Sequence, residues 1–158
     1  MLILILVSLS AISQEVKETF LLPKGFQGRV YVVFGQSNFR ETPMVNGRRF
    51  YNIPMDGIFV TCSYFLLGSL SDREYYYVDS MGNKTIIPVC QDYNTLGDTA
   101  LIFHNEMYLQ RSVTDGDGVP IDIIEIQVMN RQTSLFLGSD KERRDFEEKL
   151  KAKTGRAL

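Results

Sequence analysis

Short runs of β-branched and aromatic residues, separated by glycine, proline, aspartate and asparagine, recur along most of this chain. Such runs are typical of strands, and the residues between them are those that form tight turns. Residues 124–128 alternate between apolar and polar side chains, as in a strand with one buried and one exposed face. No helical segment separates consecutive runs, which excludes a Rossmann-type sheet. The sequence therefore predicts a mainly β protein, an antiparallel β-sandwich of about seven to nine strands, with strands in the runs 29–34, 57–63, 74–78, 84–89, 99–110 and 121–129.

Two of the turns are specified by their residues. Segment 79–83 places Gly82 between two strand-like runs and predicts a hairpin, and Pro88 predicts that the second arm is an edge strand or ends there. The sequence Asp-Gly-Asp-Gly at 115–118 resembles the start of a calcium-binding loop, but the later positions lack oxygen ligands and the closing glutamate. We interpret it as a tight turn.

One α-helix is predicted at the C-terminal end of the chain, over residues 139–153. Ser139 is a suitable N-cap, with a glutamate three residues later as in a capping box. Phe146 and Leu150 are four residues apart and form a narrow apolar stripe, through which the helix should pack on the sheets. Gly155 is a suitable end of the helix.

Residues 1–13, MLILILVSLSAIS, have the features of a secretory signal peptide. Their aliphatic run is shorter than the roughly 20 residues that span a bilayer, and it lacks the alternation of the other strand-like runs, which argues against a buried N-terminal strand. Ala11 and Ser13 suit cleavage before Gln14, although no Lys or Arg precedes the apolar run. We expect an exported protein, periplasmic or extracellular, with residues 14–158 as a single β-sandwich domain that does not span the membrane. The absence of a cysteine at the cut disfavours a lipid-anchored lipoprotein.

The two cysteines, Cys62 and Cys90, do not belong to a Cys-x-x-Cys pair, so a zinc knuckle or a thioredoxin-type site has no support. In an exported protein they can form one disulfide bridge, which would stabilise the fold by roughly 3–4 kcal/mol. Two separate buried thiols are the alternative. The sequence leaves both open, and a Cα separation above about 7 Å would exclude the bridge.

Charge and histidine content exclude several classes of function. The chain has 17 Lys and Arg against 19 Asp and Glu, so it lacks the basic excess of nucleic-acid-binding domains. His104 is the single histidine of the sequence. Without a second histidine or a thiol motif, it does not indicate a metal site or a catalytic centre. We expect no cofactor, no metal site and no catalytic residue.

Several of the turn and strand residues together carry a resemblance. Residues 20–30, FLLPKGFQGRV, fit a pattern of Ile or Leu, Pro, any residue, Gly, Tyr or Phe, any residue, Gly, any residue and Val. Further matches are Ile53-Pro54-Met55-Asp56-Gly57-Ile58 followed by Thr61 and Ser63, the tyrosine-rich arm with Asp79 and Gly82, and Phe136-Leu137-Gly138. On these residues the chain resembles a family of exported bacterial domains of unknown function, over most of residues 19–150. The resemblance implies the fold and export but no activity, and Cys62 departs from it where a small hydroxyl residue is expected.

The consecutive tyrosines Tyr75, Tyr76 and Tyr77 are the candidate binding residues. On a strand, Tyr75 and Tyr77 share one face and Tyr76 takes the other, so one set is expected in the core and the other partly exposed. An exposed tyrosine on a sheet can stack on a sugar or anchor a protein partner. Cross-strand packing is the alternative role.

Two functions of different classes follow from the sequence. The first is a noncatalytic module of the bacterial cell envelope that binds an unknown protein or glycan, and immunity to a secreted toxin is one version of it. The second is a secreted hydrolase whose carboxylates converge in a cleft, with Asp79, Asp92, Asp98 and Glu106 as candidates. The composition favours the binding module.

Overall fold

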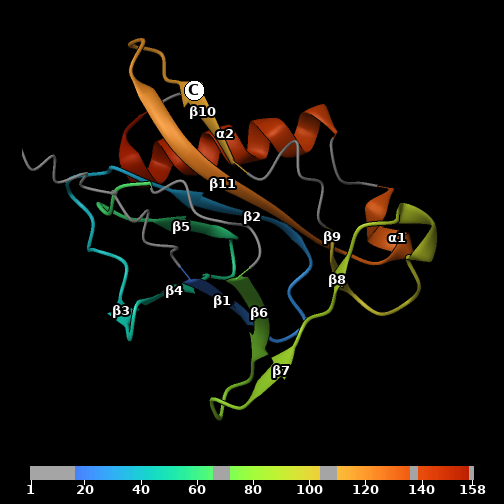
Figure 1. Ribbon diagram of the computed structural model, residues 1–158. Helices are drawn as coiled ribbons and strands as arrows, with labels where there is room; N and C mark the ends of the chain where they lie inside the picture. Colours follow the sequence, from blue (N-terminus) through green and yellow to red (C-terminus); the bar gives the residue numbers. More distant parts are fainter. Residues whose placement is uncertain (1–16, 66–71, 104–109, 136–138, 157–158) are drawn as a thin grey trace, which may run out of the picture.

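The computed structural model describes residues 17–65, 72–103, 110–135 and 139–156, with residues 110–113 described by their backbone. The strands form two mixed sheets, here called sheet A and sheet B (Figure 1). Sheet A contains β1 (Lys17–Pro23), β3 (Met44–Val45), β4 (Arg48–Asn52), β6 (Arg73–Val78) and β7 (Lys84–Ile86). Sheet B contains β2 (Gly28–Val33), β5 (Ile58–Val60), β8 (Val89–Cys90), β9 (Leu101–Phe103), β10 (Gln110–Thr114) and β11 (Pro120–Met129). The helical segments are the 3₁₀-helix η2 (Tyr93–Thr95) and the α-helices α1 (Arg131–Ser134) and α2 (Asp140–Thr154).

The sheets are mixed, so the prediction of a purely antiparallel sandwich was wrong. Sheet A has the strand order β3-β4-β1-β6-β7, and β1 lies parallel to both of its neighbours. Sheet B has the order β5-β2-β11-β9-β8, with β10 also paired to β11, and it contains the parallel pairs β2–β5 and β8–β9. The described residues form 11 strands, which is more than the predicted seven to nine. Two of these strands, β3 and β8, have only two residues each.

Both sheets contribute to one hydrophobic core. In sheet A, Phe20 stacks on Tyr51 and Tyr75 with ring centroids 4.8 and 5.1 Å apart, and all three side chains are buried. Sheet B supplies aliphatic residues from β2 and β11, such as Val32 and Ile126. Stacked aromatic rings add to the stabilisation that burial of their apolar area provides. The two sheets that form this core confirm the prediction of a mainly β protein.

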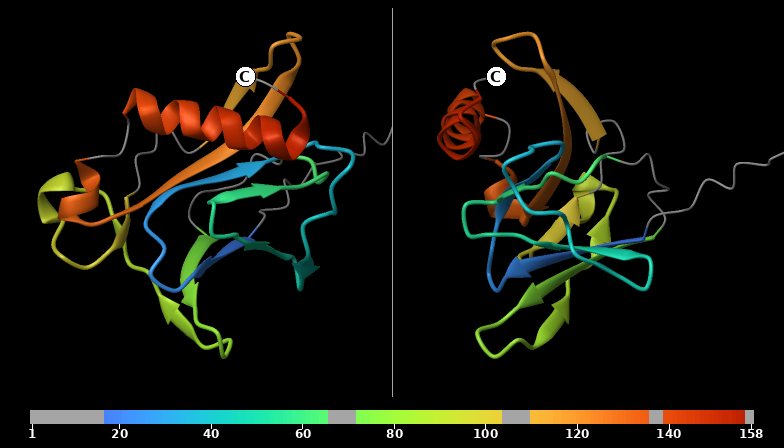
Figure 2. Two further views of the ribbon diagram at one scale, coloured as in Figure 1. Left: turned by 180° about the vertical axis from the view of Figure 1, so that it is seen from behind. Right: turned by 90° about the vertical axis from the view of Figure 1, so that its left-hand side faces the viewer.

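The predicted C-terminal helix is confirmed as α2. The Ser139 side chain accepts a hydrogen bond from the backbone of Glu142, and Gly155 ends the helix in a left-handed conformation. The helix lies along the side of sheet B that points away from sheet A (Figure 2). Phe146 and Leu150 are buried there, so the two-residue apolar stripe is sufficient to dock the helix.

The two turns predicted at residues 79–83 and 115–118 are also present. Asp79 accepts hydrogen bonds from the backbone nitrogens of Met81 and Asn83, at 2.9 Å each, and closes the β6–β7 hairpin. Strand β7 is at the edge of sheet A and ends before Pro88. Asp115 accepts hydrogen bonds from the next residues in the same way and closes the β10–β11 turn.

A buried charged group lies at the start of β1. The Glu18 carboxylate accepts a hydrogen bond of 2.6 Å from the Tyr51 hydroxyl and forms an ion pair of 2.6 Å with Arg73 Nε. Burial, followed by the nearby Glu18 charge, raises the pKa of Tyr51, so this hydroxyl stays protonated and acts as the donor. The group ties β1 to both of its parallel neighbours, β4 and β6.

Candidate functional site

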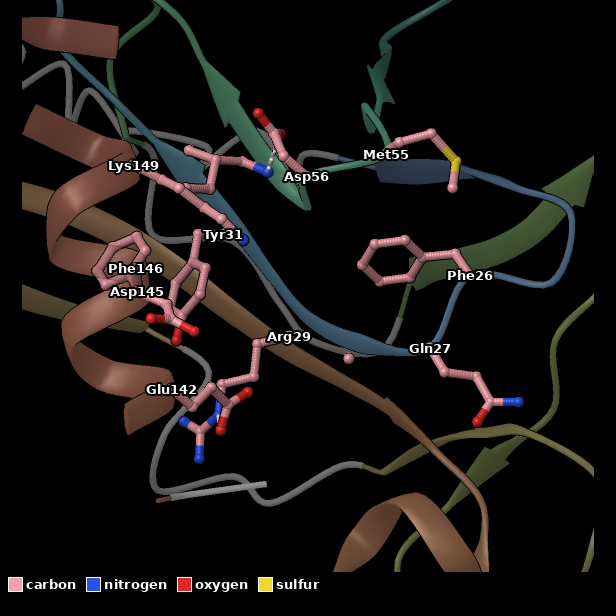
Figure 3. A pocket seen from close by; sticks show the side chains of 12 residues that line it. Phe26, Gln27, Arg29, Tyr31, Met55, Asp56, Glu142, Asp145, Phe146 and Lys149 are labelled. Carbon is pink, nitrogen blue, oxygen red and sulfur yellow. Dashed lines mark hydrogen bonds and ion pairs between the residues drawn. The ribbon is translucent and has the colours of Figure 1, made fainter. Parts of the chain in front are cut away.

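A groove of about 200 Å³ lies between α2 and two turns, the turn between β1 and β2 and the turn before β5 (Figure 3). The first turn contributes Phe26, and the second contributes Met55 and Asp56. Helix α2 contributes the opposite wall, including Glu142 and Phe146. Both turns belong to the segments that carry the family resemblance, and the structure brings them together at this one place.

The turn before β5 approaches the start of β2 so closely that it requires glycine. Gly57 has a φ of +78°, and a Cβ atom there would lie 2.4 Å from the carbonyl oxygen of Arg29. The Gly57 carbonyl accepts a hydrogen bond of 2.8 Å from the backbone nitrogen of Tyr31. A residue without a side chain is needed where two backbones come this close, which explains the turn sequence before β5.

The walls of the groove combine aromatic and thioether side chains with charged ones. Tyr31 and Phe146 stack with ring centroids 3.7 Å apart, while Phe26 and Met55 lie on the other side of the opening (Figure 3). Met55 is 71% exposed at the rim. The Tyr77 hydroxyl donates a hydrogen bond of 2.8 Å to the carbonyl oxygen of Phe26 and so positions the first turn.

Ion pairs surround the apolar walls. Arg29 is paired with the buried carboxylate of Glu125 and lies 3.1 Å from that of Glu142. Burial lowers the pKa of Arg29, but the nearby carboxylates outweigh that effect and the pKa is raised. For Asp56, burial raises the pKa of the carboxyl group. Hydrogen bonds from Lys153 and from the Ile58 backbone outweigh this effect and leave the pKa below its ordinary value. Glu142 and Lys153 both belong to α2, so these ion pairs hold the helix against the sheet.

The chemical capability of the groove follows from this geometry. Arg29 is paired with Glu142 and Asp56 with Lys153, while Asp145 and Lys149 add further charged groups to the lining. Aromatic and thioether side chains line the rest of the open space. Such a pocket can accept one apolar side chain of a partner and surround it with a polar rim, which is the composition of a protein-binding hot spot.

The three candidate tyrosines have different environments. Tyr75 is 2% exposed in the core, and burial raises its pKa to about 12. Tyr77 is half-buried and reaches the groove only through its hydrogen bond to Phe26. Tyr76 is half-buried on the side of sheet A that points away from the core. The expected separation of Tyr76 from its two neighbours is therefore present.

Both cysteines are free thiols, with Cys62 half-buried and Cys90 buried. Cys62 follows β5 and Cys90 lies in β8, and these strands are at opposite ends of the strand order of sheet B. Four strand spacings amount to about 19 Å, far beyond the roughly 7 Å that a disulfide spans. The Cys90 thiol instead donates a hydrogen bond of 3.0 Å to the carbonyl oxygen of Asp92. The structure therefore contains two separate thiols.

Two of the candidate carboxylates of the hydrolase hypothesis, Asp79 and Asp92, accept hydrogen bonds from backbone nitrogens of their own turns. Asp79 closes the β6–β7 turn, and Asp92 caps η2 by accepting a hydrogen bond of 2.9 Å from the Asn94 backbone. Asp98 is exposed in the loop after η2. His104, Glu106 and the leader 1–13 lie outside the described residues. Within the described part of the chain, no group of three or more His, Cys, Asp or Glu side chains is arranged to hold a metal ion.

The sequence predicted the helix, and the resemblance covered both turns, but neither indicated the site that they form together. Phe26, Met55 and Asp56 belong to the segments that carry the resemblance, and Glu142 belongs to the predicted helix cap. No local pattern indicates that segments more than 80 residues apart share one surface, so only the fold reveals the groove.

Comparisons with known proteins address the family and the fold. The profile of DUF6843, a family of unknown function, matches residues 14–135. A crystal structure of a Bacillus anthracis protein provisionally called a lipoprotein aligns with a TM-score of 0.61 and 15% sequence identity, over 89% of this chain and 97% of that one. No curated protein matches the sequence. No helix in the described ranges is both long and apolar enough to cross a membrane.

Proposed function

The chain belongs to DUF6843, a family of unknown function, and we propose that it is an exported, noncatalytic binding module of the bacterial cell envelope. In this proposal the groove between α2 and the two turns holds an apolar side chain of a partner protein. The groove, with its aromatic walls and paired charges, is the single observation on which the proposal rests.

Export is supported by the leader-like sequence of residues 1–13. It is also supported by the similar fold of a Bacillus anthracis protein that is provisionally called a lipoprotein. N-terminal sequencing of the protein isolated from its host tests export directly. A chain that begins at Gln14 in the envelope fraction is the expected result, and an intact leader on cytosolic protein would contradict it.

A protein partner is favoured at the groove for two reasons. A volume of about 200 Å³ is suited to one side chain rather than to a drug-sized ligand, whose pockets are usually larger than about 300 Å³. Met55 is exposed at the rim, and methionine adapts its shape to a partner surface at little cost. A binding role also requires no chemistry from the residues that line the groove.

Photo-crosslinking in the host cell tests the groove as the docking site. A benzophenone amino acid at position 55 should crosslink one envelope protein, and Met55→Lys should weaken binding of that protein once it is purified. Met81, which is 81% exposed in the β6–β7 turn, provides the matched position for both changes. Equal crosslinking from positions 55 and 81, or none from position 55, would show that the groove is not the docking site.

A further inference from the structure

The side of sheet A that points away from the core has its own cluster of aromatic and aliphatic side chains. Phe20, Tyr51 and Tyr75 point into the core from β1, β4 and β6. Because side chains alternate along a strand, the residues next to them point outward. We call the outward cluster the outer platform, and it comprises Leu21, Phe50, Tyr76, Lys84 and Ile86.

Strand register makes the outer platform continuous. Leu21 is paired with Tyr76, and Tyr76 is paired with Ile86, so these side chains form a row across β1, β6 and β7. On the other side of β1, Asn52 extends the same row. Ile86 is 67% exposed and Asn52 is exposed, so the row is accessible at both ends.

Lys84 lies over the rings of the outer platform. Its ammonium nitrogen is 5.8 Å from the ring centroid of Phe50 and 5.9 Å from that of Tyr76. At these distances the positive charge interacts favourably with the electron-rich faces of both rings. The lysine side chain therefore crosses the platform while it remains exposed to the solvent.

In the described part of the chain, the carboxylates on this side of sheet A form their ion pairs with Arg48 and Lys17 and not with Lys84. Arg48 lies 2.9 Å from Asp72 and 3.4 Å from Glu74, and Lys17 lies 3.0 Å from Asp72. Lys84 has no carboxylate within 4.0 Å among the residues described. An anionic group from outside the chain would complete the electrostatics of this surface.

We propose that the outer platform binds a saccharide that carries a carboxylate, as in an acidic polysaccharide. The C–H face of a sugar ring packs on a flat aromatic side chain, and the outer platform has two such rings with the Lys84 ammonium group over them. A carboxylate on that sugar pairs with Lys84. Asn52, at the end of the row, supplies amide groups for the sugar hydroxyls. This surface is separate from the groove, which lies beyond sheet B.

Binding to acidic wall polysaccharide purified from the host, before and after chemical reduction of its carboxyl groups, tests the proposal. We expect the purified protein to bind the native polymer, and reduction to weaken the affinity at least about tenfold. Lys84→Gln should weaken binding of the native polymer to a similar degree, with little effect on the reduced polymer. Lys141→Gln makes the same charge change on exposed α2 and should have no effect.

Two further variants examine the aromatic part of the outer platform. Tyr76→Leu and Phe50→Leu retain apolar packing but remove a flat ring, and each should weaken binding roughly three- to tenfold with an unchanged thermal unfolding curve. Unchanged affinity after carboxyl reduction overturns the proposal, as does the absence of any binding to the native polymer. Capture of an envelope protein that depends on Lys84 while the polysaccharide fails to bind also overturns it.

Discussion

Replacing Gly57 by alanine tests whether the close approach of its turn to β2 stabilises the groove. The left-handed conformation of Gly57 costs an alanine about 1 kcal/mol. The added Cβ would also lie 2.4 Å from the backbone oxygen of Arg29, and a backbone atom cannot move aside by a change of rotamer. The Gly57 turn must move away from β2, which weakens the hydrogen bond from Tyr31 to Gly57 and adds about 1–2 kcal/mol. We expect Gly57→Ala to lower the free energy of unfolding by about 2–3 kcal/mol.

Gly82→Ala is the matched control for this prediction. Gly82 also has a positive φ, of +85°, but an added Cβ would have no heavy atom within 4 Å. It should therefore cost only the conformational part, about 1 kcal/mol. Equilibrium unfolding in urea, followed by far-UV circular dichroism, measures both variants. Equal losses of stability in the two variants would refute this reasoning, because they would mean that the contact between the Gly57 turn and β2 has no energetic consequence.

Three other variants test the packing and the charged groups. Phe146→Ala should destabilise the protein by about 3 kcal/mol in urea, because it removes a buried ring that docks α2. Glu18→Gln should cost about 3 kcal/mol in the same assay, since it leaves the buried Arg73 without its ion pair. Lys153→Ala should destabilise at pH 7, and by less as the pH falls below 3.8. The pKa of Asp56 is lower in the folded protein than its ordinary value of 3.8, so its ion pair contributes stability above that pH, and this contribution is lost as the pH falls through the folded pKa.

The elements that sequence predicted correctly are those specified by nearby residues. The helix is set by Ser139, Gly155 and an apolar stripe, all within one short segment. The β6–β7 hairpin is set by Asp79 and Gly82. In each case the residues that determine the structure lie within one short segment, so the pattern is sufficient without knowledge of the fold.

Parallel pairing could not be predicted, because its partners are far apart in the chain. The turn after β1 resembles a hairpin turn, yet it takes the chain from sheet A to sheet B, so β1 and β2 do not pair. Strand β1 instead pairs with β4 and β6, and Glu18 contacts Arg73, 55 positions away. The alternation of apolar and polar residues is the same in parallel and antiparallel strands, so it carries no information about direction.

The groove shows why a site can remain hidden even when its parts are predicted. Its turns lie within the matched residues 14–135, whereas Glu142 and Phe146 belong to a helix beyond them. Tyr31 is only 5% exposed, and Phe146 is the ring that stacks on it. The concave surface therefore exists only when α2 lies on sheet B, and a partner in the groove must contact the helix and the turns at the same time. Recognition of this kind depends on the docking of α2 as much as on the residues that line the opening.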